Sequence, residues 1–114
     1  MLNFERLLVW QKSIEYAEIL VRIADDLPQR YQFSFGDQLR RAALSIPSNI
    51  AEGYGRQFNK EYRQFLSVAY GSLCELRTQI RLSVDLGYIK EPSLVLSLAE
   101  EVSKMLYRMI YPVR

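Results

Sequence analysis

Residues 59–86 read NKEYRQFLSVAYGSLCELRTQIRLSVDL, the longest regular pattern in the chain. The apolar residues recur at spacings of three and four, as on one face of an α-helix. They are Tyr62, Leu66, Ala69, Leu73, Leu76 and Ile80. Asn59 is a good N-cap residue, and Gly87 stands where helices commonly end. The pattern therefore predicts one long amphipathic helix over residues 59–86.

The same period occurs near both ends of the chain. Residues 4–27 carry two neighbouring apolar sets, one of Leu7, Trp10, Ile14, Ala17, Val21 and Ala24, the other of Val9, Tyr16, Leu20, Ile23 and Leu27. Pro28 ends this helix, since a residue before proline disfavours the α conformation. Residues 92–111 also carry two sets, Val95, Leu98, Val102, Met105 and Met109 beside Leu94, Ala99, Leu106 and Ile110. Pro92 is a favoured first-turn residue for that helix.

A further helix is predicted over residues 35–54. Ser34 is placed to cap it, Gly53 and Gly55 mark its end, and its inward stripe is Leu39, Ala43, Ile46 and Ile50. Pro47 interrupts the pattern, because it removes one backbone hydrogen bond and should kink or split the helix at a cost of about 3 kcal/mol. The flanking Ser45, Ser48 and Asn49 could satisfy the freed groups or restart the helix.

Four amphipathic helices joined by short loops predict an all-α fold, an up-and-down antiparallel four-helix bundle with its second helix kinked at Pro47. A chain of 114 residues suits one domain, residues 1–114. The helices over residues 4–27 and 92–111 have wider apolar faces than one bundle uses. The surplus indicates either a generous core or a stripe that packs against another subunit, and we favour an oligomer.

Composition excludes several kinds of chemistry. The chain has 49% hydrophobic and 25% charged residues, no His and one Cys. Without His it lacks most zinc sites, Ser-His-Asp and Cys-His catalysis and the His-dependent ribonucleases, and one Cys cannot form an internal disulfide. No signal peptide and no apolar run of about 20 residues is recognisable. We therefore expect a cytoplasmic protein that is not an enzyme, uses no metal or cofactor and binds no membrane.

Three local features invite a chemical interpretation that their surroundings do not support. Cys74 has no neighbouring His, and we expect it to be a packing residue rather than a nucleophile, although Arg77 and Arg81 leave the alternative open. The acidic pairs 25–26 and 100–101 point to diverging helix faces and predict solvated charges. Residues 52–56, EGYGR, hold two glycines and an arginine but lack the Gly-Lys-Ser/Thr ending of a phosphate loop, which favours helix caps and a turn.

Positive charge gathers in the middle of a chain whose net charge is +2. Residues 30–81 hold eight basic and four acidic residues, whereas residues 1–29 hold three and five. At 100° per residue, one stripe of the helix over residues 59–86 collects Lys60, Arg63, Arg77 and Arg81, with Ser67, Tyr70 and Thr78 between them. Such a stripe suits phosphate contacts, with Tyr70 or Tyr54 available for base stacking. The alternative is a solvated face with salt bridges to Glu61 and Glu75.

Residues 38–56, QLRRAALSIPSNIAEGYGR, form a long and specific motif. Together with Trp10–Lys12, Ala69–Ser72, Glu75–Leu76 and Leu86–Tyr88, it resembles the 23S ribosomal RNA intervening-sequence protein family over essentially the whole chain. Members of that family are four-helix bundles that look like homopentamers, encoded within rRNA intervening sequences or elsewhere on bacterial chromosomes. The accessory proteins of diversity-generating retroelements are similar in fold, pentameric, and bind nucleic acid and a reverse transcriptase.

The resemblance has structural and functional implications. It implies a built-in bend at Pro47, and close helix approach at Gly53 and Gly71. It also makes Arg40, Arg41 and Arg56 candidates for nucleic-acid contact, although the biological role of most members is undefined. The hypothesis is a pentameric protein that binds RNA, or DNA, through Arg40, Arg41, Arg56, Lys60, Arg63, Arg77 and Arg81. The alternative is a protein-interaction scaffold or an accessory subunit for an enzyme such as a reverse transcriptase.

Overall fold

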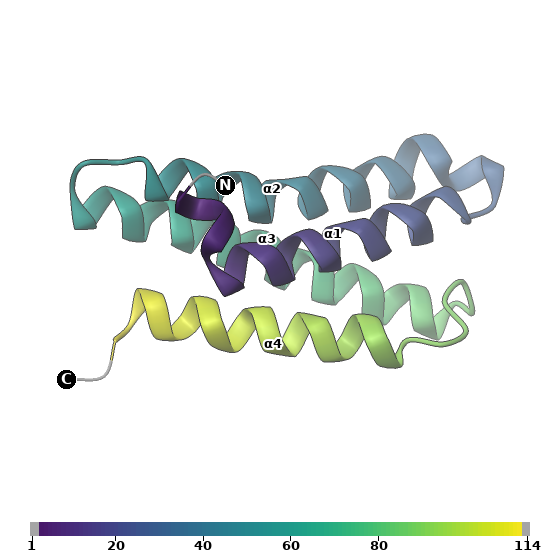
Figure 1. Cartoon of the computed structure of the whole chain (residues 1–114). Helices are drawn as coiled ribbons and strands as arrows, with labels where there is room; N and C mark the ends of the chain where they lie inside the picture. Colours follow the sequence, from purple (N-terminus) through teal and green to yellow (C-terminus); the bar gives the residue numbers. More distant parts are fainter. Residues whose placement is uncertain (1–2, 113–114) are drawn as a thin grey trace.

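The computed structural model describes residues 3–112, and its long elements are the four predicted helices (Figure 1). They are α1 (Leu8–Asp25), α2 (Asp37–Tyr54), α3 (Asn59–Asp85) and α4 (Ser93–Ile110). Consecutive helices run in opposite directions, which confirms the all-α bundle and its up-and-down order. Residues 1–2 and 113–114 of the predicted domain lie outside the described residues.

The helices surround one core. α1 packs against α2 and α4, and α3 packs against the same two helices, so α1 and α3 lie diagonally opposite. Apolar positions of each helix fill the space between them, because burying these faces is the main source of stability in a bundle. The largest fully buried side chains are Tyr16, Leu20, Leu39, Ile46, Ile50, Leu66, Leu73, Leu76, Ile80, Val95, Val102 and Leu106.

The two apolar sets of α1 are buried to different extents. Val9, Tyr16 and Leu20 of the second set are buried in the core. Of the first set only Ala24 is buried, whereas Leu7, Trp10, Ile14, Ala17 and Val21 are half-buried. In α4 both sets are largely buried, with Leu94 exposed. Of the predicted sets, the one left partly outside the core is therefore on α1, whereas the exposed large apolar side chains of α4 are Leu94, Leu96 and Tyr107.

Several helix ends differ from the predictions. α1 begins at Leu8 rather than residue 4, because extended Leu7 separates it from a short 3-10 helix, Asn3–Arg6. Asn59 is the first residue of α3 and does not cap it with a side-chain hydrogen bond. Ser34 lies in a π-helical turn, where its hydroxyl donates to the Tyr31 carbonyl at 3.4 Å instead of capping α2.

Gly87 has the predicted role. Its φ is +79°, a conformation that favours glycine, and its N–H donates to the Val84 carbonyl at 3.0 Å. The Tyr88 N–H donates to the Ser83 carbonyl at 2.8 Å. These two bonds close the C-terminus of α3 and turn the chain towards α4.

Pro47 does not split α2, which is helical without interruption from Asp37 to Tyr54. The Asn49 side chain donates hydrogen bonds to the Ser45 carbonyl at 2.7 Å and to the Ser45 hydroxyl at 3.0 Å. These bonds go to Ser45 and not to the Ala43 carbonyl, which loses its backbone donor at Pro47, so the prediction that a flanking side chain satisfies the freed group stays a prediction. The proline ring is buried, so packing around it also supports the helix.

Close helix approach is found at Gly53 but not at Gly71. A Cβ added to Gly53 would lie 2.7 Å from the Cβ of Phe65 and 3.2 Å from the Tyr62 carbonyl, so α2 and α3 meet here without room for a methyl group. A Cβ on Gly71 would meet no atom of the described part of the chain within 4 Å. The prediction for Gly71 is wrong because this glycine lies on the exposed side of α3.

Candidate nucleic-acid interface

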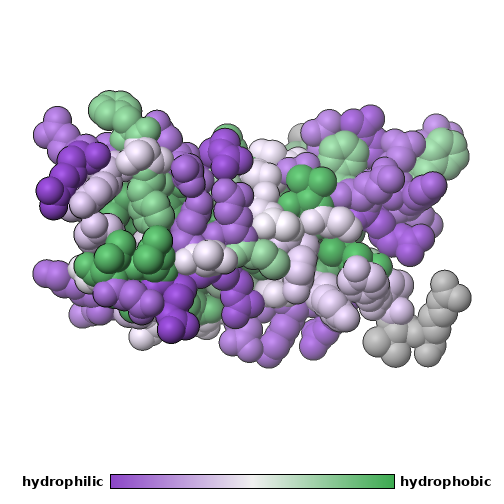
Figure 2. All heavy atoms as spheres, turned by 180° about the vertical axis from the view of Figure 1, so that it is seen from behind, coloured by the Kyte–Doolittle hydropathy of each residue, from purple (hydrophilic) through white to green (hydrophobic). Residues whose placement is uncertain are grey.

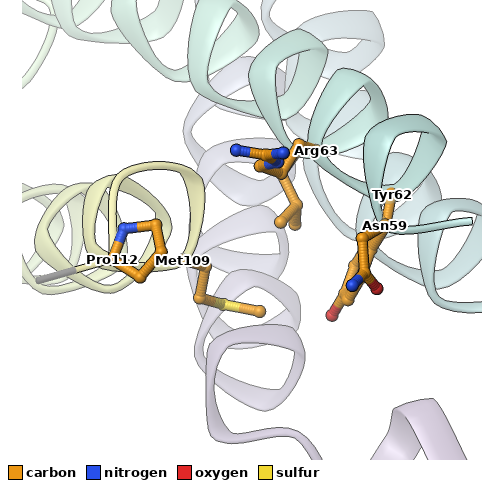
Figure 3. A pocket seen from close by; sticks show the side chains of 6 residues that line it. Asn59, Tyr62, Arg63, Met109 and Pro112 are labelled. Carbon is orange, nitrogen blue, oxygen red and sulfur yellow. The ribbon is translucent and has the colours of Figure 1, made fainter. Parts of the chain in front are cut away.

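The basic stripe of α3 lies on the flank that faces α4. Tyr70, in the middle of the stripe, packs against Tyr107 of α4 with ring centroids 6.3 Å apart. At the N-terminal end of α3, Arg63 and the α4-side residues Met109 and Pro112 line one hollow of about 410 Å³ (Figure 3). The helical period places Lys60, Arg77 and Arg81 on the same stripe as Arg63 and Tyr70. The stripe therefore borders the groove between α3 and α4.

A second hollow opens beside Arg63. It has a volume of about 540 Å³, and among residues 3–112 its lining holds no carboxylate and consists of Lys60, Arg63, Gln64, Ser67, Val68, Ile110 and Tyr111. Both cations are exposed. A hollow with two cations and several hydrogen-bond donors favours an anionic group such as a phosphate.

The four basic residues of the stripe differ in whether they form ion pairs. Within residues 3–112, Lys60, Arg63 and Arg77 form no ion pair, whereas the Arg81 Nε lies 3.2 Å from a carboxylate oxygen of Asp85. The alternative of salt bridges from the stripe to Glu61 and Glu75 is wrong for the described residues, because Glu75 pairs with Arg41 of α2 at 3.1 Å. Three of the four stripe cations therefore keep their charge available to a partner.

A row of tyrosines continues from the stripe onto α4. Tyr107 follows Tyr70, and Tyr111 follows Tyr107 with ring centroids 4.9 Å apart. Tyr107 is 53% exposed and Tyr111 is 62% exposed, so both present ring surface to solvent. These two residues were not among those predicted from the sequence, although their spacing of four residues at the end of the last helix was a usable signal. Tyr54 instead packs edge-on against Tyr62, with centroids 6.0 Å apart.

Arg40 is held by acidic neighbours. Its guanidinium lies 2.9 Å from Asp25 at the end of α1 and 3.0 Å from Asp37 at the start of α2. It also donates to the carbonyl of Gln32, in the turn between these helices, at 3.2 Å. These bonds fasten the α1–α2 connection, and two carboxylates compensate the one positive charge.

Arg41 and Arg56 lie apart from the stripe. Arg41 reaches Glu75 across the α2–α3 seam, on the other flank of α3. Arg56 pairs with Glu52 at 2.9 Å and lies 4.8 Å above the centre of the Phe65 ring. The seven predicted basic residues thus form no single surface, and only the four of α3 share one stripe.

Burial and neighbouring groups raise the pKa of tyrosines away from the tyrosine row. Burial raises the pKa of Tyr62, and the nearby Tyr54 raises it further. A hydrogen bond with Tyr31 raises the pKa of Tyr88. Burial also raises the pKa of Tyr16 well above its usual value, and the positive charge of Arg77 opposes that effect only in part. These hydroxyls stay protonated at neutral pH and therefore act as neutral polar groups.

The other chemical candidates take structural or surface positions. Cys74 is exposed on α3, so the prediction that it is a packing residue is wrong. Glu101 lies 3.3 Å from Lys12, and Glu100 lies 3.3 Å from Lys104, as expected of solvated charges. Residues 52–56 form the end of α2 and the turn after it, as the sequence favoured. Among residues 3–112, no helix is long and apolar enough to cross a membrane.

Comparison with known proteins shows which family this chain belongs to. The sequence pattern of the 23S rRNA-intervening sequence protein family matches residues 5–108, nearly all of the four helices. The chain belongs to this family. No curated protein matched the chain. Membership in the 23S rRNA-intervening sequence protein family accounts for the motif over residues 38–56.

A crystal structure gives an independent comparison. It is described as a protein with unknown function from the S23 ribosomal protein family, from Bacteroides thetaiotaomicron. The two structures agree with a TM-score of 0.84 over 91% of this chain and 99% of that one, at 24% identity. An identity this low shows a shared fold, so function has to be argued from the residues of this chain.

Proposed function

We propose that this bacterial chain is a cytoplasmic, non-enzymatic protein that binds nucleic acid, RNA above all, through the α4-facing flank of α3. The observation that carries the proposal is the exposed set of Lys60, Arg63 and Arg77, which form no ion pair within residues 3–112. Cations without acidic partners attract a phosphate backbone and release its counterions on binding. Arg81 lies on the same stripe and adds a weaker contact, since Asp85 compensates part of its charge.

The remaining predicted cations contribute less to this proposal. Arg40, Arg41 and Arg56 each have a carboxylate within 3.1 Å. A phosphate that approached them would compete with that carboxylate, so little net attraction remains. We therefore place the centre of the interface at the N-terminal half of the α3–α4 groove.

Self-association belongs to the same proposal, and we place it on the partly exposed apolar set of α1 and the residues of α2 beside it. Residues of both helices form a groove of about 430 Å³, lined by Ile14, Ala17, Glu18, Val21, Arg22, Leu44 and Pro47. Leu44 is 65% exposed there. On the face shown in Figure 2, by contrast, hydrophobic side chains form separate clusters among hydrophilic ones. A ring of five subunits, as the family resemblance implies, would multiply each weak basic stripe fivefold.

The alternative function uses the same apolar groove for a different protein. In that case the chain is a scaffold or an accessory subunit for a nucleic-acid enzyme such as a reverse transcriptase, and nucleic acid is incidental. Light scattering separates the two uses of the groove, because a chain that occupies it with its own copies forms an oligomer alone. Genes next to its own would show whether a retroelement or an rRNA insertion is present.

The test of nucleic-acid binding is a titration with a labelled bacterial rRNA fragment, followed by fluorescence anisotropy at several salt concentrations. We expect affinity that falls steeply with salt, and a flatter dependence when Arg63, Arg77 and Arg81 are all changed to Gln. The matched control changes Arg40, Arg41 and Arg56 to Gln, which removes the same formal charge from the compensated positions. Equal losses in both variants, or no binding even at low salt, would contradict the proposed interface.

A further inference from the structure

The tyrosine row and the two hollows beside it occupy one end of the α3–α4 groove. Tyr70, Tyr107 and Tyr111 follow one another with ring centroids 6.3 and 4.9 Å apart and ring planes inclined by 53° and 49°. Inclined rings do not close each other's faces, and Tyr107 and Tyr111 are more than half exposed. Part of each ring is therefore accessible to another flat ring, which could stack on it.

The cations lie within reach of this row. Lys60, Arg63 and Tyr111 line the same hollow, together with the hydrogen-bonding side chains of Gln64 and Ser67. One small surface thus combines positive charge that the described residues leave unpaired, neutral donors and exposed aromatic rings. This combination matches the chemistry of a nucleotide, whose phosphate is anionic and whose base is flat and apolar on both faces.

From this arrangement we propose that the row binds single-stranded nucleic acid, with unpaired bases stacked on Tyr107 and Tyr111 and the backbone phosphates held by Lys60 and Arg63. Tyr111 follows Tyr107 by four residues, just beyond the end of α4, and their ring centroids are 4.9 Å apart. Bases in a duplex are stacked about 3.4 Å apart on their own neighbours, so their faces are closed to side chains. Only splayed, unpaired bases can use both rings. This inference rests on the proposed nucleic-acid function and narrows its ligand to single strands.

The test compares a labelled 12-nucleotide oligo(U) with a duplex RNA of equal length by fluorescence anisotropy. Changing both Tyr107 and Tyr111 to Leu keeps apolar bulk but removes the rings, and should weaken oligo(U) binding about tenfold or more. The control changes both residues to Phe, which retains the rings and should keep affinity within about twofold. Changing Lys60 and Arg63 to Gln should instead lower the slope of affinity against salt by about 1.4, from two lost phosphate contacts.

The outcomes separate this inference from the function beneath it. Oligo(U) binding that is unaffected by the Leu changes, or duplex binding as tight as oligo(U) binding, overturns the single-strand inference and leaves nucleic-acid binding in place. Absence of binding to either RNA overturns both. Photocrosslinking of 4-thiouridine-substituted oligo(U) to the unchanged protein tests the row without relying on the stability of a variant. Adducts at Tyr107, Tyr111 or the α3 residues beside them support the site, and adducts confined to α1 and α2 overturn it.

Discussion

The polar residues on the two flanks of α3 differ in whether they are bonded to a neighbouring helix. On the α2 side, Ser72 and Ser45 share a hydrogen bond of 2.8 Å, and Glu75 pairs with Arg41. Gln79 donates to the side-chain oxygen of Gln38 at 3.3 Å, although its own buried side-chain oxygen has no hydrogen-bond partner within residues 3–112. The α4 side instead carries the tyrosine row and the cations Lys60, Arg63 and Arg77, which form no ion pair with any residue from 3 to 112.

This difference shows which surface is available to a partner. Polar groups that satisfy one another gain little from a new contact, because a partner must first replace the bonds they already make. Unpaired cations and exposed rings have no such bonds to lose. The number of basic residues on a segment therefore says less about binding than the position of the acidic residues around them.

The largest expected effect on stability comes from a substitution that disturbs the packing between α2 and α3. Changing Gly53 to Ala should lower the free energy of unfolding by about 1–3 kcal/mol, since the new methyl group would collide with Phe65 and force the helices apart. The matched control is Gly71→Ala, which should raise the free energy of unfolding by about 0.5–1 kcal/mol through helix propensity alone. Urea unfolding measures both. Equal effects of the same sign would show that the seam is not tightly packed at Gly53.

A smaller effect is expected at Tyr16, which lies near the cation Arg77 of the α4-side stripe. Tyr16 is fully buried, and its hydroxyl has no hydrogen-bond partner within residues 3–112. Changing it to Phe removes an unsatisfied polar group and should raise the free energy of unfolding at pH 7 by about 1 kcal/mol. A loss of stability in urea unfolding would mean that the hydroxyl is satisfied after all.

The same substitution makes a prediction for alkaline pH. Burial raises the folded-state pKa of Tyr16 above the unfolded value of about 10. The folded chain therefore holds this proton more tightly than the unfolded chain does. The free energy of unfolding does not depend on this group well below pH 10, and it falls as pH rises above 10. Between pH 8 and pH 11 the unchanged protein should lose more stability than Tyr16→Phe. Parallel curves for the two proteins would show that Tyr16 titrates equally in both states.

The smallest expected effect is at the compensated pair of Arg41 and Glu75. Their side chains are 67% and 40% exposed, and solvent screens such pairs strongly. Changing Arg41 to Gln should alter the free energy of unfolding by less than about 0.5 kcal/mol and leave RNA affinity nearly unchanged. Arg63→Gln, measured alongside by anisotropy, should weaken RNA binding more. A larger binding loss for Arg41 than for Arg63 would reverse the assignment of the two flanks.

Periodicity predicted the helices well and their ends less well. Each long apolar stripe became a helix, because one buried face per helix is enough to fix the period. The ends depended on local geometry that residue types do not determine. Asn59 and Ser34 are suitable capping residues, yet neither caps a helix, and extended Leu7 starts α1 four residues later than predicted.

The candidate site was predictable in part. The 100° step per residue placed Lys60 and Arg63 on one stripe, and the structure keeps them together at one hollow. The sequence did not show that Arg40 meets Asp25, 15 residues away, or that Tyr70 meets Tyr107. Those contacts join different helices, and their partners depend on how the helices rotate against one another.

The sequence alone determined the helical period, the number of long helices and the family, because each depends on neighbours along the chain. The tertiary structure decided which of the two apolar sets of α1 is buried, which cations are neutralised and which tyrosines stack. All three depend on the rotation of each helix about its own axis. That rotation is set by packing against two neighbouring helices at once, as at Gly53, where α2 and α3 meet too closely for a methyl group.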